Sequence, residues 1–341
     1  MKEKLPVIYL SGNAYDIGFN HGKQLKDRIH RTIDFYNKIF MSNQEEIFNR
    51  ALEFKDVIHT FNPDYCIEIE AIAQGAGIDE RWIYALNSRS EILNSVSNEC
   101  TAFYFKQTNI LAQNWDWSSE LEDLAVILHI TRLDGHQIIM MTEPGIIGKI
   151  GMNSAGIGVT LNILFVNQRL NGLPIHITLR ALLDTTNIEE GLAKLKDFTY
   201  GKASNIIYAN ADNQGFNLEF AGDLFYKTDL TGEYLFHTNH FLSNTILNQA
   251  LKNPASSYSR YDRGSEMLSI LEDFGIEQAK SILLDKENSE LPICRKYIPD
   301  ELITNSGTVC SIIMDLKNQK FIITKGNPLE NDFVTLGFIN N

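Results

Sequence analysis

The sequence predicts an α+β protein in which two layers of strands lie between layers of helices. Residues 1–97 have mainly helical periodicity, whereas the pattern changes to strands from Cys100 onward. The later strands fall into at least two groups, each flanked by a pair of helices. This order is typical of a layered sandwich of two sheets with helices outside.

Composition restricts the class of protein. Hydrophobic residues make up 44% and charged residues 21% of the 341 residues, as in an ordinary globular protein. The net charge of −13, without a long basic run, argues against nucleic acid or an anionic membrane as the main partner. No stretch approaches the roughly 20 apolar residues of a membrane span, and residues 1–6 lack the apolar core of a secretory signal. We therefore expect a cytoplasmic protein without a membrane partner.

The first hundred residues are expected to form one short strand and then helices. The apolar run at 7–10 predicts the strand, and apolar residues at helical spacing predict a helix up to Phe40. Further helices are predicted over 44–60, 65–76 and 79–94, with Asp79 as an N-cap. His21 lies beside glycines at a helix start, which favours a structural role over a catalytic one.

The rest of the chain is expected to be rich in strands. Helices are predicted to begin at Pro174, after the N-cap Asn187 (188–198), and at Ser256. The predicted strands cover 124–130, 137–141, 146–151, 156–162, 205–210, 216–220, 307–314 and 320–324. The four cysteines are widely scattered without a C-x-x-C pair, so neither a zinc site nor a disulfide framework is expected: Cys66, Cys100, Cys294 and Cys310.

A candidate nucleophile opens the first of these strands. Cys100 precedes an apolar, aromatic run, and a second run at 110–112 ends in a polar and aromatic cluster. The two runs can pair as a hairpin through residues 106–109, which returns Asn114 and Asp116 to the neighbourhood of Cys100. A thiol, an amide and a carboxylate would then lie together.

This cluster needs a base, because a free cysteine has a pKa near 8.5. The nearest histidines, His129 and His136, lie some way along the chain. If the Glu99–Cys100 bond were cut, the new α-amino group would titrate at about 7.7–8.0 and would serve as that base. Asp116 would orient it, as a third group orients the base in triads. The alternative is that Cys100 is simply a buried strand cysteine.

The chain resembles the acyl-coenzyme A:6-aminopenicillanic acid acyltransferase family in two segments of its motif, Cys100-Thr101 and Gln113-Asn114-Trp115-Asp116. These peptidase C45-like enzymes are N-terminal-nucleophile (Ntn) hydrolases, distantly similar to choloylglycine hydrolases. The resemblance implies a four-layer αββα sandwich with an α-helical N-terminal segment, within one structural domain. It also implies a zymogen that cleaves itself between Glu99 and Cys100 into an α chain (1–99) and a β chain (100–341). The product would be an α/β heterodimer, whose further homo-oligomerisation stays open. The family often has glycine where this chain has Glu99.

The resemblance assigns further site residues. Asn239, within a Thr-Asn-His segment, would donate to the tetrahedral oxyanion, and Arg260 would lie beside the nucleophile. Ser259, Ser204 and Thr101 would support the site. The alternative that His237 and His240 bind a metal is weak, because H-x-x-H lacks a third ligand nearby.

Three classes of function follow for a small-molecule amide or thioester substrate. The first is an amidase for N-acyl amides, and the second is an N-acyltransferase that uses acyl-coenzyme A as co-substrate, with no other cofactor and no metal. Water and amine attack the same acyl-enzyme, so the sequence does not separate these two. The third is a non-catalytic binding protein that keeps the fold and is never processed, for which Glu99 is the hint.

Overall fold

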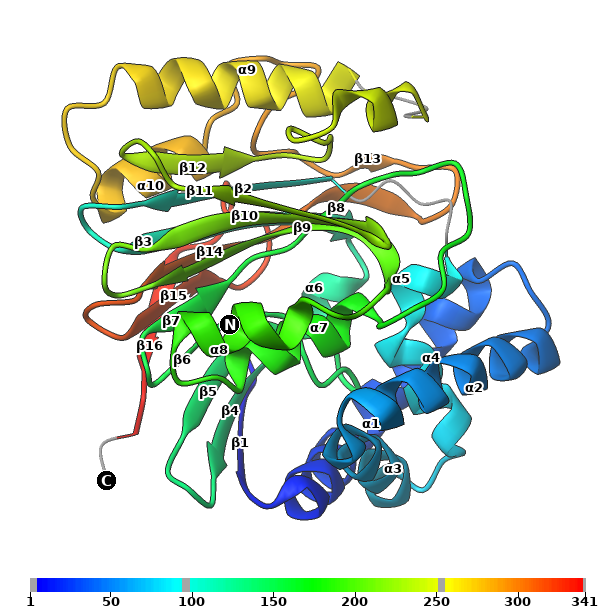
Figure 1. Cartoon of the computed structure of the whole chain (residues 1–341). Coiled ribbons are helices and arrows are strands. Elements are labelled where there is room, and N and C mark those ends of the chain that lie inside the picture. The colour runs from blue at the N-terminus through cyan, green and yellow to red at the C-terminus, as the bar shows by residue number, and fades with distance from the viewer. Residues whose placement is uncertain (1–4, 94–98, 251–254, 340–341) are drawn as a thin grey trace.

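The computed structural model describes residues 5–93, 99–250 and 255–339 (Figure 1). Its helices are α1 (Ala14–Ile39), α2 (Gln44–Phe61), α3 (Pro63–Ala76), α4 (Glu80–Asn87), α5 (Arg89–Ile92), α6 (Leu121–Leu124), α7 (Ile175–Leu183), α8 (Ile188–Leu195), α9 (Ala255–Ser269) and α10 (Ile276–Leu283). A 3-10 helix, η1, covers Thr245–Ala250.

The strands form two sheets. The first sheet has the order β1-β4-β5-β6-β7-β9-β10-β11, and β8 also pairs with β9. Its strands are β1 (Val7–Gly12), β4 (Val126–Arg132), β5 (Gln137–Thr142), β6 (Ile150–Asn153), β7 (Ile157–Val159), β8 (Asn162–Ile163), β9 (Tyr200–Asn210), β10 (Gly215–Gly222) and β11 (Leu224–Asp229). The β1–β4 pair is parallel, and the other pairs are antiparallel.

The second sheet has the order β12-β2-β3-β14-β15-β16, and β13 also pairs with β14. Its strands are β2 (Glu99–Phe105), β3 (Ile110–Ser118), β12 (Tyr234–His237), β13 (Ile298–Pro299), β14 (Asn305–Asp315), β15 (Lys320–Thr324) and β16 (Phe333–Gly337). All of its pairs are antiparallel.

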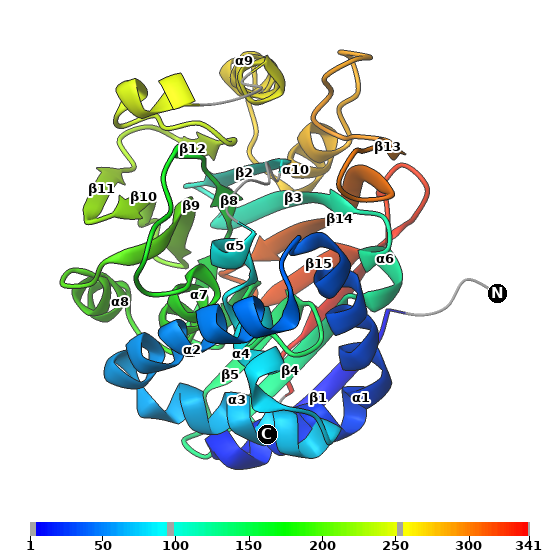
Figure 2. The ribbon, with the colours of Figure 1, turned by 90° about the vertical axis from the view of Figure 1, so that its right-hand side faces the viewer.

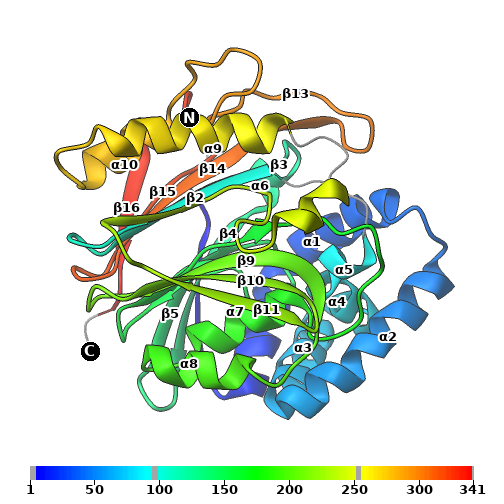
Figure 3. The ribbon, with the colours of Figure 1, turned by 45° about the horizontal axis from the view of Figure 1, so that its top comes forward.

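The two sheets face each other, and helices cover their outer faces. Alternate residues of β2 belong to different cores, because strand side chains point to opposite faces in turn. Tyr104 belongs to the core between the sheets, whereas Phe103 and Phe105 pack with Leu268 of α9 and Leu283 of α10. Helices α9 and α10 lie over the second sheet and α7 and α8 over the first (Figures 1 and 3). The αββα sandwich is therefore confirmed.

The N-terminal helices α1–α5 gather at one side of the sandwich (Figures 1 and 2). Glycines permit the close packing of α1 on α3: a Cβ at Gly22 would lie 2.0 Å from the carbonyl oxygen of Ile72. His21, in the same helix, is buried and accepts a hydrogen bond from the Gly145 backbone at 2.9 Å. Its contact thus joins α1 to the turn after β5.

Several predicted elements have different bounds. The helix predicted over 79–94 begins after the N-cap Asp79 but is interrupted at Ser88, and position 94 lies outside the described residues. A tertiary contact explains the interruption, since Asn87 donates to Gly145 O at 2.8 Å and accepts from Ile147 N at 3.0 Å.

Other bounds also shift. The helix predicted over 188–198 ends at 195, and the strand predictions over 146–151 and 156–162 become shorter strands separated by loops. Six elements were not predicted from sequence: β11, β12, β13, β16, α6 and α10.

Candidate active site

The hairpin β2–β3 positions Cys100. The predicted turn and pairing are confirmed, with Cys100 opposite Trp115, Thr101 opposite Asn114 and Glu99 opposite Asp116. The thiol-bearing residue is only 3% exposed. Cys100 therefore lies within the sheet core and not on an open surface.

Strand alternation places the side chains of Cys100 and Asn114, which we expected together, on opposite faces of the second sheet. Cys100 and Tyr104 belong to the inner face of β2, and the Tyr104 hydroxyl donates to Asn210 O of the first sheet at 2.9 Å. Asn114 instead donates to the carbonyl of Leu283 in α10 at 2.8 Å and accepts from the Ser311 hydroxyl. Its amide ties α10 to the outer face of the sheet, so the expected place of Asn114 beside the thiol is corrected.

Side chains from distant segments hold the Cys100 backbone. Its N–H donates to Asn239 Oδ1 at 2.8 Å. Its carbonyl oxygen accepts from Arg260 at 2.7 Å and from Asn162 Nδ2 at 3.1 Å. Arg260 also donates to Thr101 Oγ1 at 3.0 Å and to Asn239 Oδ1 at 2.9 Å. Three of the expected residues, Thr101, Asn239 and Arg260, thus meet at Cys100.

The Asn239 amide has a defined orientation. Its oxygen accepts from Cys100 and Arg260, and its nitrogen donates to Ile163 O at 2.8 Å. An amide nitrogen carries two hydrogens, and Ile163 accepts one. In the uncut chain, Asn239 is therefore an acceptor for the Cys100 nitrogen and keeps one further hydrogen for another acceptor.

The segment that carries Asn239 is anchored on both sides. The Glu219 carboxylate accepts from the backbone nitrogens of Leu242 at 2.7 Å and Ser243 at 2.9 Å, and contacts His237 Nε2 at 2.8 Å. The hydroxyl of Ser257 accepts from Asn239 N at 2.8 Å. These contacts hold the Asn239 backbone between β12 and α9.

The environment of the thiol disfavours its ionised form. Burial raises the pKa of Cys100, the charge of Asp116 raises it further, and the result is about 12. The Arg260 charge and a hydrogen bond with the Gln113 side chain act in the opposite direction on this pKa. The thiol is therefore protonated at neutral pH in the uncut chain and needs a base to react.

Asp116 lies deep in the sheet, in register between Glu99 on one side and Thr308 on the other. It is only 1% exposed. Besides its effect on Cys100, its charge contributes to raising the pKa of the buried Cys294 thiol. The carboxylate therefore acts electrostatically on the Cys100 thiol.

The hydroxyls of two supporting residues expected from sequence form hydrogen bonds with parts of the chain other than Cys100. Ser259 donates to Leu291 O at 3.3 Å, and Ser204 donates to Lys202 O at 3.3 Å. Adjacent residues on a helix point in different directions, so Ser259 cannot share the orientation of Arg260. Ser256, one turn earlier, accepts from Arg260 Nε at 3.3 Å.

Sequence analysis therefore missed four contributors: Gln113, Asn162, Ser256 and Ser257. The four-residue spacing of Ser256 from Arg260 is a signal that helical periodicity could have revealed. Gln113 stands in the quoted motif, and the structure adds its contacts with Leu161, whose carbonyl accepts from Gln113 at 2.6 Å. No local pattern marks Asn162.

Within residues 5–93, 99–250 and 255–339, no helix is long and apolar enough to cross a membrane. In the same part of the chain, no group of three or more His, Cys, Asp or Glu side chains is arranged to hold a metal ion. The rings of His237 and His240 contact Glu219 and Ser257, respectively, at 2.8 Å.

Comparisons with known proteins show the family of the chain. The family model for acyl-coenzyme A:6-aminopenicillanic acid acyl-transferase matches residues 105–330. The acyl-coenzyme A:6-aminopenicillanic-acid-acyltransferase 40 kDa form of Emericella nidulans is 32% identical over 339 residues, which cover 95% of this chain and 94% of that protein. The beta-alanyl-dopamine/carcinine hydrolase of Drosophila melanogaster is 22% identical over 286 residues, which cover 70% and 73%.

A solved structure supports the fold. A variant of the conjugated bile acid hydrolase from Clostridium perfringens superposes with a TM-score of 0.52 at 13% identity, covering 70% of this chain and 92% of that one. At this identity the likeness concerns the fold, which is that of an Ntn hydrolase. With the family match over most of its length, the chain belongs to the acyl-coenzyme A:6-aminopenicillanic acid acyl-transferase family.

Proposed function

We propose that this protein cleaves itself before Cys100 and then transfers acyl groups from amides or thioesters through an acyl-Cys100 intermediate. The observation that carries this proposal is the hydrogen bonding that fixes the Cys100 backbone nitrogen. Asn239 accepts its hydrogen at 2.8 Å, and Arg260 fixes both Asn239 and the Cys100 carbonyl. The nitrogen that would become the catalytic amine is thus already fixed before cleavage.

Self-cleavage would begin with attack of the Cys100 sulfur on the Glu99 carbonyl carbon. The C–N bond between Glu99 and Cys100 breaks, the thiol proton passes to the leaving nitrogen, and a thioester forms. Water then hydrolyses the thioester, which releases the thiol and leaves a carboxylate on Glu99. The high pKa of the buried thiol predicts that this first step is slow, since little thiolate exists at neutral pH.

In the processed protein, the α-amine of Cys100 would take the thiol proton as general base. The thiolate then attacks the substrate carbonyl, and the second Nδ2 hydrogen of Asn239 stabilises the oxyanion. A preorganised donor of this kind is worth about 2.7–4 kcal/mol. The α-ammonium returns the proton to the leaving amine or thiol, and the charge of Asp116 stabilises that ammonium. Water or an acceptor amine finally releases the acyl group.

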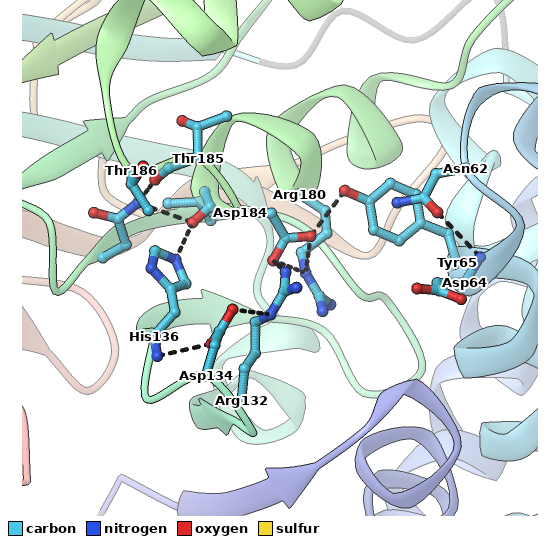
Figure 4. A network of polar contacts seen from close by, with 12 residues as sticks. Asn62, Asp64, Tyr65, Arg132, Asp134, His136, Arg180, Asp184, Thr185 and Thr186 are labelled. Carbon is cyan, nitrogen blue, oxygen red and sulfur yellow. Dashed lines mark hydrogen bonds and ion pairs between the residues drawn. The ribbon is translucent and has the colours of Figure 1, made fainter.

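The two fragments would remain together after cleavage. Buried polar contacts join the part before Cys100 to the part after it (Figure 4). Tyr65 donates to Asp184 at 2.8 Å, and Arg180 pairs with Glu68 at 2.8 Å and with Asp184 at 3.1 Å. Apolar side chains of α1–α4 belong to the same buried core as those of the two sheets, so separation of the fragments would expose this apolar surface to water. We therefore infer a stable α/β heterodimer.

The named relatives suggest the substrate class. One is named as an acyltransferase for acyl-coenzyme A and 6-aminopenicillanic acid, and the other as a hydrolase of beta-alanyl-dopamine and carcinine. We infer that this protein forms or breaks the bond between an acyl group and a small amine. Analysis of the products with and without a competing amine separates transfer from hydrolysis.

The first test is the intact mass of the purified protein under denaturing conditions. We expect two fragments, the second beginning at Cys100, and a single uncut chain for Cys100→Ala. Glu99→Gly tests whether the residue before the nucleophile limits the rate of cleavage. An active Cys100→Ala protein, or a parent chain that stays whole while it turns over amides, would contradict the mechanism. A parent that stays whole and inactive would instead support a non-catalytic binding protein.

A further inference from the structure

A cavity with an excess of positive charge opens beside the catalytic sheet. Its volume is about 270 Å³, and we call it the basic cavity. Its lining includes the side chains of two lysines, Lys286 and Lys296, against the single carboxylate of Glu290, while Cys294 and Leu329 contribute apolar wall and Arg295 completes it. A local excess of positive charge is notable in a chain whose net charge is −13.

Nearby carboxylates do not neutralise its lysines. Asp285 and Glu287 both pair with Arg263, at 2.9 and 3.4 Å. Among the residues that the structure describes, neither Lys286 nor Lys296 forms an ion pair. Arg263 thus forms ion pairs with the two carboxylates next to Lys286, so the charges of Lys286 and Lys296 remain available to an anionic ligand.

The basic cavity is connected to the reaction centre through the second sheet. Arg295 N donates to Thr308 Oγ1 at 2.9 Å, and Thr308 N donates to Arg295 O at 3.0 Å. Thr308 is the register partner of Asp116, which is in turn the partner of Glu99. The backbone of Arg295 therefore lies three inter-strand spacings from the bond that we expect to be cut, or about 14 Å at the usual spacing of about 4.8 Å.

This distance selects among anionic groups. A carboxylate next to the reacting amide is separated from the carbonyl by only two or three bonds of about 1.5 Å each, and would not reach the basic cavity. An anion at the far end of a long arm would reach it. The phosphates of an acyl-coenzyme A meet this condition, as does a carboxylate at the end of an extended acyl chain.

We propose that the basic cavity binds a remote anionic group, phosphate or carboxylate, of the substrate whose acyl group reacts at Cys100. This inference rests on the proposed function. Lys286 and Lys296 supply direct contacts, and the Arg295 backbone anchors the wall to β14. Charge-assisted hydrogen bonds of this kind are about twice as strong as neutral ones.

The test compares matched substrates. One pair is an acyl-coenzyme A and the N-acetylcysteamine thioester of the same acyl group. The other is an amide whose long acyl chain ends in a carboxylate and the methyl ester of that carboxylate. For each pair, the measured quantity is the ratio of kcat/KM for the anionic member to kcat/KM for the neutral member.

The variant is the double substitution Lys286→Glu with Lys296→Glu. Lys106→Glu with Lys317→Glu is the matched control, because it also replaces two lysines by glutamates, in the turn after β2 and beyond the far end of β14, away from Thr308. We expect the double substitution to lower the ratio at least tenfold for one pair, while the control stays within twofold of the parent. A fall for the thioester pair identifies phosphate, and a fall for the amide pair identifies carboxylate. Ratios within twofold of the parent for both pairs would overturn the proposal.

Binding separates this proposal from the proposed function. Calorimetry with free coenzyme A and with the dicarboxylate of the long acyl chain measures the basic cavity without turnover. Weaker binding to the double variant supports the cavity even if the parent turns over no substrate, in which case only the proposed function fails. Turnover of the neutral substrates together with unchanged binding and ratios refutes the cavity alone.

Discussion

Arg260→Lys is the most informative single substitution, because it keeps the charge and removes the geometry. Arg260 is fully buried, and its two terminal nitrogens donate to Cys100 O, Thr101 Oγ1 and Asn239 Oδ1 at 2.7–3.0 Å. A lysine has one nitrogen at the end of a flexible stem and cannot reproduce this planar fork.

The magnitude follows from the number of bonds lost. A lysine nitrogen that replaces one terminal guanidinium nitrogen loses at least one hydrogen bond to a charged donor, worth about 1.5–3 kcal/mol. Because Arg260 orients both the Cys100 backbone and Asn239, we expect the activation barrier to self-cleavage to rise by this amount. The rate of cleavage should then fall about 10- to 150-fold.

The assay is a time course of cell-free synthesis followed by denaturing electrophoresis, which counts cut and uncut chains. Arg263→Lys is the control, since Arg263 lies three residues further along α9 and pairs with carboxylates of the surface loop. Its rate of cleavage should match that of the parent. Thermal unfolding of each variant checks that the chain is folded. If folded Arg260→Lys protein is cut within twofold of the parent rate, Arg260 does not position the reaction centre.

Three further predictions concern the oxyanion donor, the helix contact and the buried charges. Asn239→Leu removes the amide hydrogen and should slow turnover by about 10²–10³-fold in a steady-state assay; turnover near the parent value would exclude Asn239 as donor. Gly22→Ala places a Cβ against a backbone carbonyl of α3 and should destabilise the fold by about 1–3 kcal/mol in thermal unfolding. Gly232→Ala is the control and should leave the stability unchanged, because a Cβ at Gly232 would have no other atom within 4 Å. Burial raises the pKa of Asp184, but the charges of Arg180 and Arg132 outweigh burial and hold it below its ordinary value. The stability from this pairing is therefore complete above about pH 4 and is lost as the pH falls through the lowered pKa. Arg180→Met should cost about 3–5 kcal/mol at neutral pH in urea unfolding, and the deficit should narrow below pH 4; a deficit independent of pH would contradict the pairing.

Elements that depend on short stretches of sequence were predicted well. Asp79 and Asn187 are N-caps, as expected, and each accepts a hydrogen bond from a backbone nitrogen two or three residues later. The β2–β3 hairpin joins neighbouring runs through a short turn, so its pairing followed from local pattern alone. The bounds of these elements are set mainly by contacts within a few residues, and those contacts are visible in the sequence.

The chemistry of the site was predicted only in part. The motif around Cys100 and Asp116 predicted a nucleophile and a carboxylate close together, and the two residues do lie on adjacent strands. Arg260 and Asn239 came from resemblance and not from spacing, since each lies more than 130 residues beyond Cys100. Asn114 stands in the motif, yet strand alternation directs it to α10.

What only the tertiary structure decided is the set of contacts between segments far apart in the chain. The parallel pairing of β1 with β4 and the place of β14 beside β3 join residues more than 100 positions apart. Asn162 reaches the Cys100 carbonyl in the same way, from a strand of the opposite sheet. Hydrophobic periodicity states which face of an element is buried, but not which element buries it. The sequence by itself thus predicted Cys100 as the nucleophile and indicated the family, whereas the packing of two sheets determined which side chains contact Cys100.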